Sequence, residues 1–199
     1  MVRVAGWSAL CAEMDRVKLG LKVHDRRGLW PHEPRRPPAP PERIADIATV
    51  TRCPVDPDYA DFLRHADGWP GILQDIDLFG TRDFGTATGT GAYARAEESV
   101  RTIGAVARIE RDRGFSRLVP IGASRDDIDV LVLHCNGEPD RRNPVSWLAA
   151  AEVDRYPTFT DFFLAMIAAN EAEADFLARP RRPGPCSAPA GNRLRPLRR

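Results

Sequence analysis

The spacing of apolar residues predicts three helices in the first third of the chain. Residues 7–21 and 42–51 repeat apolar side chains at helical spacing, which gathers them on one face. A third helix should begin at Asp56, a good N-cap, with Pro57 at the first helical position. Its buried stripe comprises Val55, Tyr59, Phe62, Leu63 and Ala66. We expect Gly68 to end this helix, because glycine readily takes the left-handed conformation.

The next segment alternates apolar and polar residues, as a half-exposed strand does. Residues 72–79 place Ile72, Ile76 and Leu78 on one side and Asp75 and Asp77 on the other. A large aromatic residue, Trp69, precedes this strand in a turn. We expect its indole to pack over the sheet edge, with an exposed contact for a partner as the alternative.

The remaining pattern predicts more strands between two helices. A short strand at residues 117–122 contains a proline, which favours an edge or strand-end position. Residues 129–135 are almost wholly apolar and predict a central strand. The other expected elements are a helix at 92–111, a strand at 144–149 and a closing helix at 158–178. This order predicts an α+β fold whose antiparallel or mixed sheet is flanked by helices.

Proline clusters divide the chain into four predicted parts. Six of the 18 prolines lie between Pro31 and Pro41, and five lie in the last twenty residues. Because such segments resist packing into a core, they predict a connector and a tail. We expect an N-terminal helix at 1–21, a proline-rich connector at 22–41, a single folded domain at 42–178 and a disordered basic tail at 179–199.

The net charge of +1 hides an asymmetry between these parts. The tail holds seven arginines and no acid, which leaves a net charge of −6 on residues 1–178. A basic tail can attract nucleic acid or a membrane surface without specificity, but a solvated terminus is the preferred interpretation. The four cysteines form no CxxC pair, so we expect neither a zinc site nor a disulfide framework. With no apolar run long enough to span a bilayer and no signal peptide, a cytoplasmic location is expected.

The sequence contains no convincing catalytic, metal or cofactor motif. The glycines of residues 85–93 match neither a dinucleotide fingerprint nor a P-loop. His134 and Cys135 are neighbours on a predicted strand, so their side chains point to opposite faces and cannot form a nucleophile–base pair. The acids of residues 126–129 lack the spacing of a calcium loop. We therefore expect a binding protein rather than an enzyme.

The candidate contact residues are four acids and one indole. An acidic patch on the exposed side of the strand would speed association with a basic partner and fix its orientation. The candidates are Asp67, Trp69, Asp75, Asp77 and Asp83.

Several motifs in sequence order resemble the SMI1/KNR4 family, also called the SUKH superfamily. They are "CPVDPDYADFLRHADGWPG", "IDLFG", "LVPIG" leading to "DVLVLHC", and "YPTFTDFFLAMI". The resemblance covers residues 42–177 and departs from the family where Asp67 replaces the usual asparagine and where "ASRDDID" lacks the usual turn glycines.

The resemblance implies an α+β domain that binds proteins and has no invariant catalytic set. Many bacterial members are similar to immunity proteins that neutralise toxins such as nucleases, which are usually basic. The expected function is therefore the occlusion of a basic toxin by direct binding, without a specific nucleic-acid partner and without a membrane partner. A regulatory or scaffolding module that uses the connector and the tail for recognition is the alternative.

Overall fold

The computed structural model describes residues 6–85, 91–103, 117–125 and 128–179, which form one α+β domain. Its helices are α1 (Trp7–His24), α2 (Pro41–Thr51), α3 (Pro57–Leu63), α4 (Thr81–Phe84), α5 (Ala92–Thr102) and α7 (Phe159–Ala178). Its strands are β1 (Trp69–Leu73), β2 (Ile76–Leu78), β3 (Arg117–Ser124), β4 (Val130–Cys135), β5 (Val145–Leu148) and β6 (Glu152–Tyr156). The predicted tail and the second half of the helix expected at 92–111 lie outside the described residues.

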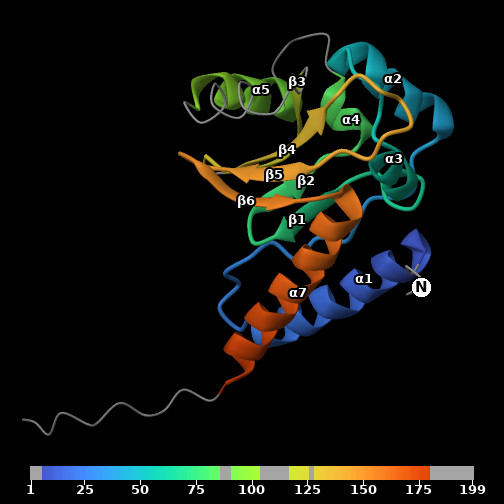
Figure 1. The fold of residues 1–199 in the computed structure, drawn as a ribbon. Helices are drawn as coiled ribbons and strands as arrows, with labels where there is room; N and C mark the ends of the chain where they lie inside the picture. The colour runs from blue at the N-terminus through green and yellow to red at the C-terminus, as the bar shows by residue number, and fades with distance from the viewer. Residues whose placement is uncertain (1–5, 86–90, 104–116, 126–127, 180–199) are drawn as a thin grey trace, which may run out of the picture.

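The six strands form one antiparallel sheet in which each strand pairs with its sequence neighbour. Figure 1 shows α1 and α7 side by side on one side of the sheet and α5 on the opposite side. The helices α2, α3 and α4 gather at one end of the sheet. The α+β class and the antiparallel sheet are confirmed.

The segment predicted as a single strand at 72–79 is a tight hairpin. Leu73 pairs with Ile76, so only Gln74 and Asp75 form the turn between β1 and β2. Gln74 takes the left-handed conformation with φ of 51°, which a two-residue hairpin turn requires at its first position. The prediction of one strand was wrong because this turn contains no glycine or proline to mark it.

The prediction of an edge or strand-end position for the proline of residues 117–122 was also wrong, because Pro120 lies inside β3 (Arg117–Ser124). β3 lies between β2 and β4 in the interior of the sheet. The register shifts between Pro120 and Gly122, so a β-bulge accommodates the proline there. The central position of β4 is confirmed, and its six residues are all buried.

The third helix begins as the sequence predicts. Asp56 accepts hydrogen bonds from the backbone N–H groups of Asp58 and Tyr59, which satisfies donors that a helix N-terminus leaves unpaired. The helix ends at Leu63, several residues before Gly68. Gly68 has φ of +85°, and a Cβ atom there would lie 2.6 Å from the backbone nitrogen of Gly80. Glycine is therefore required at position 68 because the backbone passes close to Gly80, and not because the helix ends there.

The N-terminal helix is part of the core. Trp7 packs against Phe62, Phe159 and Phe163, with ring centroids 5.2–5.7 Å apart. Met14 and Leu21 of α1 are also fully buried. Because this apolar face is covered by α7, α1 contributes to the same hydrophobic core as the sheet.

The proline-rich connector is fixed to the rest of the domain. The backbone N–H of Ala39 donates to Leu63 O at 2.9 Å, and that of Asp67 donates to Pro37 O at 3.1 Å. The side chain of Arg35 donates to His65 O at 2.5 Å and pairs with Asp15. These contacts tie the connector to α1 and to the turn after α3.

A disulfide links Cys53, just after α2, to Cys135 at the end of β4. The two Cα atoms are 6.4 Å apart, within the range that a disulfide spans. The expectation of no disulfide framework overlooked this bond because 82 positions separate the two residues. Cys11 is a free buried thiol.

Candidate functional site

Trp69 lies in the core rather than on the surface. The residue is 1% exposed, and its ring centroid is 6.0 Å from that of Phe163 on α7. This agrees with the preferred expectation that the indole packs. Among the described residues its Nε1–H has no hydrogen-bond partner, which is uncommon for a buried indole.

Asp67 joins two segments of backbone inside the domain. Its carboxylate accepts hydrogen bonds from the backbone N–H and from the hydroxyl of Thr81. The residue is 8% exposed, and the adjoining Gly80 leaves no room for a Cβ atom beside Asp67 O. The carboxylate therefore holds the start of α4 against the turn after α3.

Asp83 also bonds within its own neighbourhood. Its carboxylate accepts from Gly80 N–H at 2.7 Å, which caps α4, and forms an ion pair with Arg36 of the connector. The nearby Tyr59 hydroxyl donates to Phe79 O at 2.7 Å. Burial raises the pKa of that tyrosine well above its ordinary value.

Asp77 and Asp75 lie on the hairpin, and of these two only Asp75 has no bonded partner among the residues that the structure describes. Asp77 accepts from Gly71 N–H at 2.7 Å and binds the guanidinium of Arg125 through two nitrogens, at 2.8–3.1 Å. Arg125 also pairs with Glu33 of the connector at 2.8 Å. Asp75 occupies the hairpin turn and is partly exposed.

Beside Asp77, a polar hollow opens between α5 and strands β2, β3 and β4, and we call it the α5 cleft. Its volume is about 290 Å³. Its charged and hydroxyl side chains are Asp77, Arg95, Ser99, Ser124, Arg125 and Asp129. By register, Asp77 pairs with Ala123, which pairs with Val130, so Asp77 and Asp129 lie two strands apart. Two strand spacings correspond to about 10 Å.

The α5 cleft can bind a polar group through charges of both signs. Asp129 accepts a hydrogen bond from the indole of Trp147, and Asp77 accepts one from Gly71 N–H. The fold therefore orients both carboxylates of the cleft. Oriented carboxylates favour a cation such as an arginine or lysine side chain. Among the described residues that line the cleft there is no histidine, cysteine or lysine.

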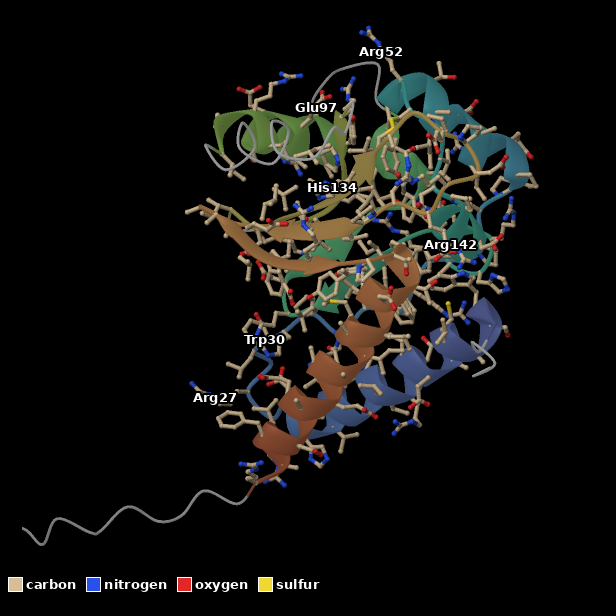
Figure 2. All side chains as sticks on the ribbon, viewed as in Figure 1. Arg27, Trp30, Arg52, Glu97, His134 and Arg142 are labelled. Atoms are coloured by element: carbon tan, nitrogen blue, oxygen red, sulfur yellow. A yellow bond between two sulfur atoms is a disulfide. The ribbon has the colours of Figure 1, made fainter. Side chains whose placement is uncertain are left out.

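A second polar cluster crosses the sheet at β4, β5 and β6. His134 Nε2 lies 2.7 Å from Ser146 Oγ, and that hydroxyl donates to Glu152 Oε1 at 2.7 Å. Both His134 and Ser146 are fully buried, and Figure 2 shows His134 within the layer of the sheet. A serine with a histidine at this distance suggests a nucleophile, but both side chains are fully buried and the hydroxyl already donates to Glu152.

The bonds of His134 and Cys135 agree with the prediction that these neighbours do not form a nucleophile–base pair. His134 contacts Ser146, whereas Cys135 is bonded to Cys53. The alternation of residues 144–149 places Ser146 on one face of a predicted strand. The sequence does not show how this strand aligns with β4, so it could not predict that Ser146 lies beside His134. Of the acids expected at 126–129, residues 126 and 127 lie outside the described residues.

Comparisons with known proteins leave the family open, because no family model matches the chain and no curated protein is similar to it. Among the described residues, no group of three or more histidine, cysteine or acidic side chains could hold a metal ion. None of the described helices has both the length and the apolar character needed to cross a bilayer.

Proposed function

We propose that this chain is a protein-binding domain, and specifically an immunity protein that neutralises a basic, nuclease-type toxin by covering its active site. The α5 cleft is the observation that carries the proposal, because the oriented carboxylate of Asp129 lines it and can bind a cationic side chain of the partner, while Asp77 is held by Arg125 at its edge. Asp75 lies at the tip of the adjoining hairpin, where an unpaired charge steers a basic protein toward the cleft.

The four aspartates divide into two groups under this proposal. Asp75 and Asp77 belong to the contact surface, since they are partly exposed and flank the hairpin. Asp67 and Asp83 act indirectly by fixing the segment that carries the hairpin, and Trp69 supports it from the core. The resemblance to SMI1/KNR4 proteins, the net negative charge of residues 1–178 and the cleft all favour the same class of partner.

A test co-expresses the chain with the toxin encoded beside its gene and measures cell survival. Wild-type protein should restore growth, and the purified complex should associate more slowly when Asp75 is changed to Lys, because the steering charge is reversed. Asp46→Lys is the matched control, since Asp46 is an exposed acid on α2. Failure of the wild type to protect, or equal association rates for the two variants, contradicts the proposal.

The cytoplasmic location belongs to the same proposal. The Cys53–Cys135 disulfide removes one support for it, because such bonds persist mainly in oxidising compartments. The scaffolding alternative also loses a support, since the connector is bonded to α1 and α3 rather than free for recognition.

A further inference from the structure

A hollow between α1 and the connector points to a function beyond toxin binding. We propose that it binds a small organic carboxylate through the ammonium of Lys18, with the indole of Trp69 as part of its wall. Its volume is about 340 Å³, which lies within the range of small-molecule sites of ~300–1,000 Å³. Its lining includes Lys18, Leu19, Lys22, His32, Pro34 and Trp69. We call it the Lys18 hollow.

Lys18 is a buried cation bonded to neutral oxygens. The residue is 7% exposed, and its Nζ donates to Gly71 O at 2.6 Å and to Asn170 Oδ1 at 3.4 Å. Burial of the ammonium lowers the pKa of Lys18 to about 8. A buried charge is stabilised when an opposite charge joins it, and one of its three N–H donors is still available.

The two acids at the edge of the hollow are committed to other cations. Asp15 pairs with Arg35 at 3.0 Å, and Glu33 pairs with Arg125 at 2.8 Å. Lys22, one helical turn beyond Lys18, makes no ion pair with any residue that the structure describes. The charge left to face a ligand is therefore positive.

Trp69 lines the same hollow from β1. The residue is 1% exposed, so its indole contributes an apolar wall, and the ammonium of Lys18 is the group that pairs with the charge of the carboxylate.

The remaining lining selects an apolar body for the ligand. Leu19 and Pro34 line the hollow together with the indole of Trp69. Leu19 is 64% exposed, so covering it removes apolar surface from water. The expected ligand is therefore a monocarboxylate with a compact hydrocarbon or aromatic body, and benzoate is a suitable probe.

Benzoate and benzamide separate charge from shape in the test. We expect the Trp69 indole resonance in ¹⁵N–¹H NMR spectra of the full chain to shift in a saturable way with benzoate. Benzamide, which has nearly the same shape without the charge, should leave the resonance unchanged. Inorganic phosphate tests whether any anion suffices, and a response to phosphate equal to that with benzoate overturns the assignment of a carboxylate site.

Variants identify the residues that hold the probe. Lys18→Met keeps an unbranched side chain without the charge, and it should weaken benzoate binding by at least about tenfold, as expected for loss of a charged partner. Arg43→Gln is the control, because Arg43 is an exposed cation on α2. Equal weakening by both variants overturns the proposal.

The lysine content of the chain supplies a readout that needs no variant. Lys18 and Lys22 are the only two lysines among 29 basic residues. Reductive methylation followed by mass spectrometry can therefore report on each lysine separately. Benzoate should slow modification of Lys18 several-fold, and an unchanged rate at saturating benzoate contradicts the site even if Lys18→Met fails to fold.

A peptide arm distinguishes a free metabolite from a carboxylate of a protein partner. An acetylated peptide ending in a free phenylalanine carboxylate is compared with the same peptide as its amide. We expect benzoate to bind more tightly than either peptide, because the hollow has room for a small molecule only. Tighter binding of the acid peptide than of benzoate overturns the small-molecule assignment. Neither outcome depends on whether the chain protects cells from a toxin. The carboxylate site and the proposed immunity function can therefore be contradicted independently.

Discussion

Three of the predicted contact acids accept a hydrogen bond from a backbone N–H. Asp67 accepts from Thr81, Asp77 from Gly71 and Asp83 from Gly80. Carboxylates bind such donors strongly and thereby hold irregular segments that have no ladder of their own. At the residue scale, most of the acids around the hairpin serve the fold first, whereas Asp75 has no bonded partner among the described residues.

This division predicts that substitutions of two aspartates in the same region differ strongly in their effect on stability. Asp67→Ala leaves the backbone N–H and the hydroxyl of Thr81 without their buried acceptor, so we expect the free energy of unfolding to fall by about 2–4 kcal/mol. Asp75→Ala removes an unpaired, partly exposed carboxylate and should change it by less than about 0.5 kcal/mol. Urea denaturation measures both, and similar values for the two would contradict the roles assigned to them.

A second residue-scale prediction concerns pH. The folded pKa of Lys18, about 8, lies below the ordinary value of 10.5, so between these pH values the unfolded chain binds more protons than the folded one. The contribution of Lys18 to stability is therefore unfavourable at pH 7 and improves as pH rises toward 10.5. Its charged surroundings are Asp15 and Lys22 on α1 and His32 and Glu33 on the connector.

The measurement compares wild type with Lys18→Met by urea denaturation at pH 7 and at pH 10. The difference should shift by about 2 kcal/mol in favour of the wild type at the higher pH. Burial raises the pKa of Cys11 to about 11 and so destabilises the folded state above pH 9, but this effect is common to both proteins and cancels. Parallel pH profiles would falsify the assignment of a depressed pKa to Lys18.

At the scale of elements, the irregular parts of the sheet decide which surfaces exist. The Gln74–Asp75 turn divides one predicted strand into two, and this brings Asp77 onto β2 beside β3. The bulge at Pro120 allows β3 to lie inside the sheet. The α5 cleft is bounded by these same strands, so its position depends on two features that apolar periodicity does not encode.

The disulfide is the covalent link between two elements, and its loss has a predictable cost. Bonding Cys53 to Cys135 closes a loop of 82 positions, for which the entropy of the unfolded chain corresponds to about 4 kcal/mol. We expect a reductant to lower the urea midpoint of the wild type. The Cys53→Ala, Cys135→Ala double variant should start at the lower midpoint and show no response to the reductant. A wild type insensitive to the reductant, with its thiols shown to be free, contradicts this element-level role.

For the whole molecule, the sequence predicts those helices and strands whose local patterns of capping and apolar residues agree with their packing in the fold. The cap at Asp56, the buried strand β4 and the helix that begins after Thr158 were all found from local patterns. The connector was predicted as a spacer because prolines exclude helix, yet its polar groups bond to the turn after α3. The Lys18 hollow likewise joins α1, the connector and β1, and no local pattern can place such distant segments together.

The packing of α1 makes a prediction about the domain as a unit. Trp7 contacts three phenylalanine rings on α3 and α7, so an N-terminal helix that unfolds must expose the shared core. We expect Trp7→Ala to lower the free energy of unfolding by about 3 kcal/mol within a single cooperative transition. Phe176→Ala is the matched control, because Phe176 is an aromatic residue on α7 that is 65% exposed, and it should change stability by less than about 0.5 kcal/mol. If tryptophan fluorescence and far-ultraviolet circular dichroism instead report two separate transitions, α1 is an appendage whose contacts do not stabilise the sheet.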